Sequence, residues 1–325
     1  MFAYIIRRLL YAIPILIGVN VLTFALFFVV NSPDDMARLQ LGVKHVTPES
    51  ISRWKAARGY DKPIFWNREA GGVSQLTSTI FYEKSLRLFV GDFGRAEDGR
   101  DIGREIKTRM GPSLAIAVPT FVLGLLAAVT AALTLAYFRA TVLDLWGVTL
   151  CVTMMSISSL FYIIGGQYLA SKLLRWAPIS GYADGFDSWR FVLLPVLIGV
   201  VAGIGASTRW YRTIFIEETG KDYVRTARAK GLPERLVFGR HILKNAMIPI
   251  LTGVVAVIPL LFMGSLLMES FFGIPGLGSY TIEAIKAQDF AVVRSMVFIG
   301  SALYIGGLLL TDISYTLVDP RIRLN

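Results

Sequence analysis

The chain has 325 residues, of which 54% are hydrophobic and only 17% are charged. Soluble domains carry about 25% charged residues, so this composition excludes an ordinary soluble protein and predicts an all-α integral membrane protein. The formal net charge is +10. Basic residues gathered on one side of a membrane explain that charge better than nucleic-acid binding does, because no basic and aromatic recognition motif is present.

Six apolar runs predict six transmembrane helices, since a helix of about 20 apolar residues crosses the hydrocarbon core. They cover residues 9–30, 112–138, 145–171, 191–208, 246–268 and 295–317. The first run follows Arg7-Arg8, has 22 residues and shows no clear small-residue cleavage site. We therefore expect a retained first helix, within a segment 1–30 whose N-terminus is cytoplasmic, instead of a cleaved signal peptide.

Residues 31–111 form a polar insert after the first helix. Thr47, Pro48 and Gly59 are typical of the cap, the first turn and the end of a short helix. The insert carries many basic residues, nearly balanced by acids, and long translocated segments largely escape the positive-inside rule. We expect it to lie outside the cytoplasm as a cap on the first helix.

The connection between the fourth and fifth predicted helices, residues 209–245, is strongly basic. Its nine cations are Arg209, Arg212, Lys221, Arg225, Arg228, Lys230, Arg235, Arg240 and Lys244. Six spans place this connection on the same side as Arg7-Arg8 and the tail 318–325, and the positive-inside rule assigns that side to the cytoplasm. Residues 112–317 would then form the membrane core, with both termini cytoplasmic.

Within this connection the sequence predicts two short helices. Asp222 suits an N-cap or first turn, Gly231 suits a C-terminal stop, and Pro233 followed by Glu234 suits a new helix start. Three readings remain open: a solvated basic loop, a helix that binds anionic lipid, and a docking helix for a cytoplasmic protein. The caps and the small apolar face of Tyr223, Val224 and Ala227 favour docking. The sequence leaves open whether that face or the Arg225 and Arg228 side meets the partner.

Chemistry-bearing residues are scarce. Cys151 is the only cysteine, and the two histidines, His45 and His241, lie far apart in the sequence, so no disulfide or zinc site is expected. His241 sits among basic residues and makes a poor catalytic base. We expect no metal, no cofactor and no catalytic residue, and the chain also lacks the phosphate-binding sequence of an ATPase. An integral membrane enzyme is thus disfavoured.

Four charges lie at or near the ends of predicted spans: Arg139, Asp144, Glu269 and Asp312. An ion-coupled secondary carrier would more often place acids near the midplane or contain matched broken helices. Neither pattern is present, which suggests that the energy for any transport enters through another protein.

The basic connection also carries a resemblance. Its sequence YVRTARAKGLPERLVFGRHILKNAMIP resembles the EAA loop of ABC-importer permeases, with Ala227, Gly231 and the pair Ile248-Pro249 at the matching positions. Arg225 stands in place of the loop's glutamate and Thr226 in place of its first alanine. Both replacements are typical of the peptide-importer branch of the family.

Two further segments agree with this resemblance, which covers the chain except for residues 60–90. GDFGRAEDGRDIGREIKTRMGPSLAIA, from Gly91, resembles the segment before the second helix of these permeases. The C-terminal part resembles their signature near the outer mouth of the pore, carried by Glu269, Pro275, Gly276 and Gly278 and followed by Asp319-Pro320-Arg321.

The resemblance implies the first of two permeases of a dipeptide or oligopeptide importer in a bacterial inner membrane, with the type I permease fold. Its implied partners are a homologous permease that completes the pore, two ATPase subunits that bind ATP and Mg, and an extracytoplasmic solute-binding protein that contacts residues 31–111. The implied coupling residues are Asp222, Tyr223, Val224, Arg225, Thr226, Ala227, Arg228, Ala229 and Gly231. A nickel chelate, an opine or glutathione are alternative substrates, and no residue is assigned to substrate.

Overall fold

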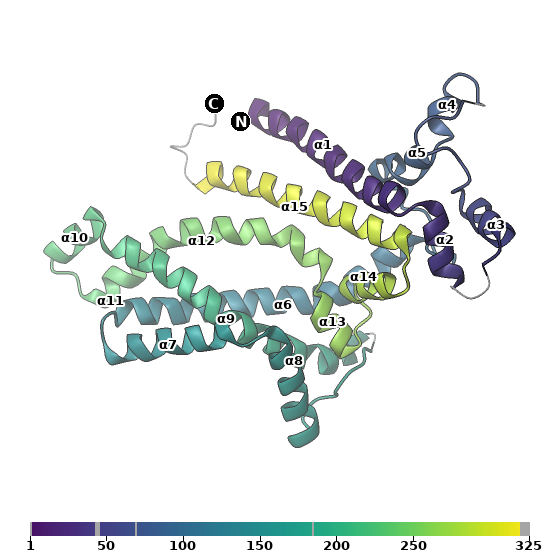
Figure 1. The fold of residues 1–325 in the computed structure, drawn as a ribbon. Coiled ribbons are helices and arrows are strands. Elements are labelled where there is room, and N and C mark those ends of the chain that lie inside the picture. The colour runs from purple at the N-terminus through teal and green to yellow at the C-terminus, as the bar shows by residue number, and fades with distance from the viewer. Residues whose placement is uncertain (1, 43–45, 69, 184, 319–325) are drawn as a thin grey trace. The chain divides into compact units, whose positions relative to one another are not determined.

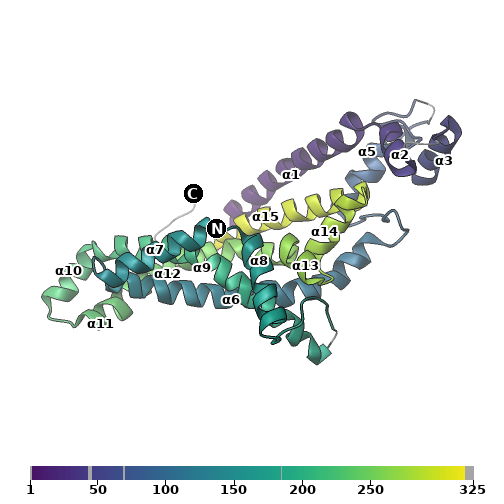
Figure 2. The same cartoon turned by 60° about the horizontal axis from the view of Figure 1, so that its bottom comes forward.

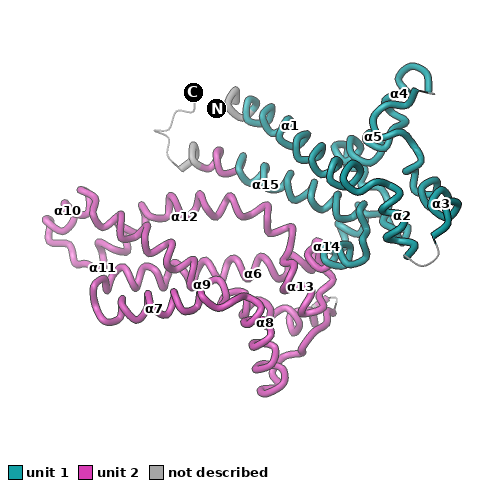
Figure 3. The backbone as a smooth tube through the Cα atoms, viewed as in Figure 1, with its two compact units in different colours: residues 1–109, 280–309 teal, residues 110–279, 310–325 magenta. Residues whose placement is uncertain are grey.

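The computed structural model describes residues 2–42, 46–68, 70–183 and 185–318. Over these residues the chain is helical, and its only strand-like pairing is an isolated bridge between Arg95 and Asp101. The chain divides into two compact units (Figure 3), residues 1–109 with 280–309 and residues 110–279 with 310–325. Each unit is described by itself.

The first unit contains the N-terminal helix, the polar insert and most of the last helix (Figure 1). Its elements are α1 (Phe2–Ala25) with a π-helical turn (Leu26–Val30), α2 (Pro33–Leu41), α3 (Pro48–Arg58), α4 (Ser74–Thr77), α5 (Ile80–Lys84), a 3-10 turn (Leu86–Val90), the start of α6 (Ile102–Tyr137), most of α14 (Leu277–Lys286) and most of α15 (Phe290–Val318).

The second unit contains the remaining helices (Figure 2). Its elements are most of α6, α7 (Val142–Ser156), α8 (Ser159–Gln167) with a π-helical turn (Tyr168–Leu173), a 3-10 turn (Gly185–Ser188), α9 (Trp189–Thr219), α10 (Asp222–Ala229), α11 (Glu234–Leu236) with a π-helical turn (Val237–Ile242), α12 (Leu243–Val257), a 3-10 turn (Ile258–Met263), α13 (Leu266–Phe272) and the first residues of α14.

Five helical segments of the described chain are long and apolar enough to cross a membrane. They are Ile6–Val30, Ile102–Tyr137, Trp189–Thr219, Glu234–Met263 and Phe290–Ser314. A sixth candidate, Val142–Ser156 with Ser159–Leu173, is bent by 89°. The number of spans is therefore five, or six if the bent pair counts as one.

The bend corrects the expectation of an uninterrupted third span over 145–171. Ile157 is extended, and Ser158 caps a new helix by accepting a hydrogen bond from the Leu160 N–H through its hydroxyl. The break frees the carbonyl of Met154, which accepts a hydrogen bond of 2.8 Å from the Tyr162 hydroxyl. Serine side chains compete with the helical backbone for hydrogen bonds, which gives the polar pair at 158–159 its tendency to start a new helix.

The insert and the first helix share one apolar core in the first unit. Phe24 and Phe28 of the first span stack at 4.7 Å between ring centroids, and Trp54 of α3 lies 5.5 Å from the ring of Tyr60. α3 begins and ends as the sequence predicts, with Thr47 as the cap and Gly59 in the left-handed conformation. Phe28 also lies 5.4 Å from the ring of Tyr60, so burial of these rings fixes the insert to the C-terminal end of the first span.

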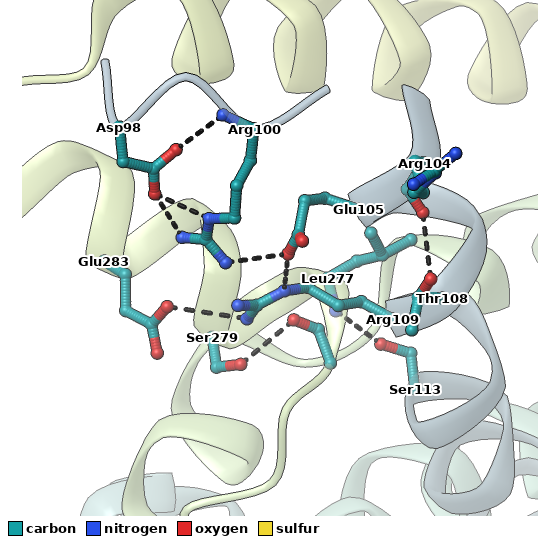
Figure 4. Close-up of polar contacts among 11 residues, drawn as sticks. Asp98, Arg100, Arg104, Glu105, Thr108, Arg109, Ser113, Leu277, Ser279 and Glu283 are labelled. Atoms are coloured by element: carbon teal, nitrogen blue, oxygen red, sulfur yellow. Dashed lines mark hydrogen bonds and ion pairs between the residues drawn. The ribbon is translucent and has the colours of Figure 1, made fainter. Parts of the chain in front are cut away.

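A chain of ion pairs decorates the surface of the first unit (Figure 4). Arg100 contacts Asp98 and Glu105, Arg109 contacts Glu105 at 2.9 Å, and Arg109 reaches Glu283 of α14 at 3.4 Å. Arg100, Asp98 and Glu283 are exposed, so their pairs add little stability, whereas the side chains of Arg109 and Glu105 are largely buried. They nevertheless connect the start of α6 to α14 within this unit.

In the second unit, α9 is the central helix, and α7, α8, α12 and α13 pack against it. A bidentate ion pair holds the N-terminal end of α7, which Thr141 caps. The guanidinium of Arg212 donates to the carboxylate of Asp144 at 2.9 and 2.7 Å. Both side chains are largely buried. Asp144 is thus a packing charge between two helices, as its position at a span end suggested.

Candidate functional site

The polar stretch between α9 and α12 folds as a short helix with well-formed ends. α10 covers Asp222–Ala229, with Asp222 in its first turn and Lys221 as the preceding cap residue. At the other end Gly231 has a φ of +76°, and its N–H donates to the Arg228 carbonyl at 2.9 Å. Glycine adopts this left-handed conformation without the steric cost of a Cβ, so the predicted stop at Gly231 is confirmed.

The two faces of α10 have different environments. Val224 is 0% exposed and Ala227 is 4% exposed, and both pack into a core cluster with Phe215 of α9 and Phe238 after α11. The small apolar face therefore packs against the chain itself and is not free to enter a cleft of a partner.

The opposite face of α10 is open. The side chain of Arg225 is 75% exposed, and Asp222, Thr226, Arg228 and Ala229 are also exposed. Of the two faces that the sequence left open, only this one is available for contact with another protein.

Side-chain contacts fix α10 to its neighbours. The Tyr223 hydroxyl donates a short hydrogen bond to the carboxylate of Glu218 at the end of α9. Burial, assisted by that carboxylate, raises the pKa of Tyr223 to about 12, so the phenol keeps its proton at physiological pH. Lys221 forms an ion pair of 2.8 Å with Glu218 as well.

A second brace joins α10 to the following helix. The guanidinium of Arg228 donates to both carboxylate oxygens of Glu234, at 2.7 and 3.2 Å. Pro233, predicted as the first helical residue, is instead the cap residue, and α11 begins one position later, at Glu234. From Glu234 the chain stays helical to Met263 as one candidate span, so that α10 is braced directly to a membrane-crossing helix.

A buried carboxylate forms a second site in the same unit. Glu269 of α13 is 1% exposed. Its Oε1 accepts hydrogen bonds from the Ser113 hydroxyl at 2.8 Å and from the Ser265 N–H at 3.0 Å, and its Oε2 accepts from the Ser279 N–H at 3.0 Å. Burial raises the pKa of Glu269, and these donors oppose that rise.

Ser113 extends this network. Its oxygen accepts a hydrogen bond of 2.7 Å from the Leu277 N–H (Figure 4). Ser113 and Glu269 together tie α6, α13 and the start of α14. No local pattern in the sequence indicates this role of Ser113, because its partners lie more than 150 positions away in the chain.

The glycines of the C-terminal signature make room for this carboxylate. A Cβ on Gly276 would overlap the carboxylate of Glu269 and lie 2.5 Å from the Ser113 hydroxyl. A Cβ on Gly278 would lie 2.6 Å from the carbonyl carbon of Ser265. Pro275 is exposed beside them. The structure thus brings Glu269, Gly276 and Gly278 together as one packed unit.

A cavity of about 640 Å³ adjoins this packed unit. It is lined mainly by apolar side chains of α6, α8, α9 and α13, and its polar lining residues are Ser113, Thr120, Ser159 and Ser265. Its volume and its mainly apolar lining with a few polar groups lie within the ordinary range of small-molecule sites, about 300–1,000 Å³.

No metal centre is found over the described residues, where no group of three or more His, Cys, Asp or Glu side chains could hold an ion. His45 and the segment Asp319-Pro320-Arg321 lie outside the residues that the structure describes.

Comparison with known proteins identifies the family. The family described as the binding-protein-dependent transport system inner membrane component matches residues 113–324, and the N-terminal part of the same type of membrane component matches residues 1–71. The chain is 32% identical over 329 residues to a protein of Brucella abortus (strain 2308) named as a peptide transport system permease, with 99% of each chain covered.

A second relative is the glutathione transport system permease protein GsiC of Salmonella typhimurium, 31% identical over 324 residues with 99% of each chain covered. The chain therefore belongs to the family of binding-protein-dependent transport system inner membrane components. It is a multi-pass membrane permease of an ABC importer, with the type I permease fold, which confirms the resemblance seen in its sequence.

Proposed function

We propose that this permease forms half of the translocation pore of an ATP-driven importer for di- or oligopeptides. The observation that supports this most directly is α10, a helix packed on one face, open on the other, and braced to a candidate membrane span. Such a helix is suited to pass a displacement from a protein outside the membrane into the membrane.

In the proposed mechanism, the exposed face of α10 sits in a groove of an ATPase subunit, and Arg225 is its most exposed cation. The buried contacts of Val224 and Ala227 and the Arg228–Glu234 brace make α10 move together with the helix that begins at Glu234. When ATP closes two partner ATPases, that movement would switch the pore from inward-facing to outward-facing. ATP and Mg stay on the partners.

A second, homologous permease would complete the pore, and a solute-binding protein would deliver the substrate from outside. The termini would be cytoplasmic, and residues 31–111 would face the binding protein. The cavity beside Glu269 would belong to the half of the pathway that this chain supplies. The packed unit of Glu269, Gly276 and Gly278 would keep the outer mouth rigid.

The peptide class rests on the names of the relatives. One is named for peptide transport and another for glutathione, which is itself a small peptide. Glutathione, a nickel chelate or an opine remain alternative substrates of the same importer class. Uptake by cells that carry the complete importer, measured for a labelled dipeptide with each alternative as a competitor, ranks these substrates directly.

The energy source is tested in proteoliposomes that contain this chain, its candidate sister permease, the ATPases and the binding protein. We expect uptake that requires internal ATP and survives collapse of the proton gradient. Uptake that follows the proton gradient and ignores ATP would instead indicate an ion-coupled carrier and would refute the proposed mechanism. Co-purification of an ATPase pair and a second permease with this chain is the simplest supporting observation.

A further inference from the structure

Arg294, in the second turn of α15, carries a buried charge that lacks an ion-pair partner among the described residues. The residue is 3% exposed, and its Nε and Nη1 make no hydrogen bond there. The guanidinium lies 5.3 Å from the ring centroid of Phe28. Arginine cannot shed its proton to escape such a site, and an unpaired buried charge costs several kcal/mol.

The carboxylate that attracts Arg294, that of Asp289, is already engaged. The carboxylate of Asp289 accepts hydrogen bonds from the Glu97 N–H at 2.7 Å and from the Val292 N–H at 3.1 Å, and it caps α15. It attracts Arg294 through space, but no ion pair joins the two groups over the part of the chain described here.

Arg294 lines a small cavity of about 130 Å³ that is rich in cations. The other charged residues of its lining are Glu83, Lys84, Arg87, Asp92 and Arg95. Both acids already form ion pairs: Glu83 pairs with Lys62, and Asp92 pairs with Arg87 at 3.3 Å. Among the residues described, Lys84 and Arg95 form no ion pair, so the cavity presents three cations to a ligand.

A wider cavity of about 440 Å³ lies next to this small one, and the two share Lys84, Arg95 and Ala291 in their linings. Arg58 and Glu97 pair with each other in the lining of the wider cavity. All of these residues belong to the first compact unit.

The surroundings of Lys84 also favour binding of an anion in this cavity. Its ammonium lies 5.3 Å from the ring centroid of Tyr60. Burial is the main cause that lowers the pKa of Lys84, and the charges of Arg294 and Lys62 lower it further. Glu83 and Glu97 oppose this change. Two like charges held near each other in a half-buried space repel, and an anion between them relieves that repulsion.

We propose that this cavity binds a carboxylate group, with Arg294 and Lys84 as its two main donors. The guanidinium matches a carboxylate in a two-pronged arrangement. A single negative charge fits better than a doubly charged phosphate, because Asp289 already offsets part of the positive charge. The carboxylate comes from a small free acid, such as a peptide terminus, or from an acidic side chain of a protein partner.

The test uses the full chain in lipid nanodiscs, with acetate replacing chloride at constant ionic strength. Ligands that bind only the folded state raise the midpoint of thermal unfolding. We expect a rise that saturates with acetate in wild type and in Arg38→Gln, an exposed control in the same unit. Arg294→Met should lose the rise, and Lys84→Gln should weaken acetate binding about tenfold, the effect of one charge-assisted hydrogen bond.

A wild-type protein that responds to acetate no more than to chloride would overturn the proposal, as would an Arg294→Met protein that keeps the response. If Arg294→Met does not fold, Lys84→Gln alone decides between the two outcomes. The source of the carboxylate is then read from competition. A dipeptide that displaces acetate better than its C-terminal amide identifies a peptide terminus. If neither compound displaces acetate, the source is an acidic side chain of a partner, whereas equal displacement by the amide, which lacks the carboxylate, would overturn the proposal.

Discussion

Substitutions on the two faces of α10 should separate the stability of the connection from its contact with a partner. Val224→Ala removes two buried methyl groups from a side chain that is 0% exposed. At about 0.8 kcal/mol for each buried carbon, plus a cavity term for incomplete collapse, we expect a loss of about 2–3 kcal/mol in the free energy of unfolding. The surface that faces the partner is unchanged, so ATPase binding should persist in the folded fraction.

Arg225→Glu makes the opposite change. This side chain is 75% exposed, and its contact with Asp222 is a surface pair of 3.5 Å, so the change in unfolding free energy should stay within about 0.5 kcal/mol. Reversal of a charge at the proposed contact should weaken ATPase binding by about tenfold or more. Arg190→Glu, an exposed reversal at the start of α9, serves as the matched control and should leave ATPase binding intact.

Both quantities are measured on the same purified proteins. The midpoint of thermal unfolding reports stability, and the amount of ATPase subunits retained on the immobilised permease reports binding. The reasoning is refuted if Arg225→Glu retains the ATPases as well as wild type does. It is also refuted if Val224→Ala unfolds at the wild-type temperature, because α10 would then not be anchored by that side chain.

Three further predictions follow from the buried charges and the tight glycine. Gly276→Ala should lower the free energy of unfolding by about 1–3 kcal/mol, because the new Cβ overlaps the carboxylate of Glu269. Gly253→Ala is the control and should not lower it, because the space around Gly253 is open. Equal melting temperatures of the two variants would contradict this. Asp144→Asn should lower the free energy of unfolding by about 3 kcal/mol, because it leaves the charge of Arg212 unpaired. In a double-mutant cycle, adding Arg212→Met should restore part of that stability. Simple additivity of the two changes would show that the pair is not coupled. Acetate binding should weaken as the pH rises toward 10.5, the ordinary pKa of lysine. The loss of affinity should begin below that pH, because burial lowers the pKa of Lys84. A Lys84→Gln protein with the same pH profile would argue against this.

The sequence was sufficient for features that depend on local composition. A run of about 20 apolar residues spans a bilayer whatever surrounds it, and Gly231 ends a helix through its own backbone freedom. α3 and α10 accordingly begin and end within one or two residues of their predicted limits. The third predicted span is present as a bent pair of helices, which its composition alone did not indicate. Its 27 residues are apolar enough, but the serines at 156–159 break the helix in the middle.

Contacts between distant elements were beyond sequence reasoning. The small apolar face of α10 looked free because its partners, Phe215 and Phe238, come from other helices. The carboxylate of Glu269 looked like a charge at the end of a span, yet its hydrogen bonds join three helices. In both cases the sequence named the residue, while the tertiary fold decides which surface that residue offers.

Arg294 shows the same difficulty at its sharpest. It stands just before the predicted last span, where a cation is normally explained by a side chain that extends to the membrane interface. That explanation requires the guanidinium to reach the membrane surface, whereas the fold leaves the residue only 3% exposed, beside Phe28 and in the lining of a small cavity. A buried cation is structural when an acid pairs with it, but Asp289, whose charge attracts Arg294, accepts hydrogen bonds from two backbone N–H groups and forms no ion pair with Arg294 among the described residues. Arg294 is therefore proposed as a ligand-binding group because the acids of its own compact unit leave its hydrogen-bond donors unpaired. No local sequence pattern indicates this, because it depends on contacts between distant residues.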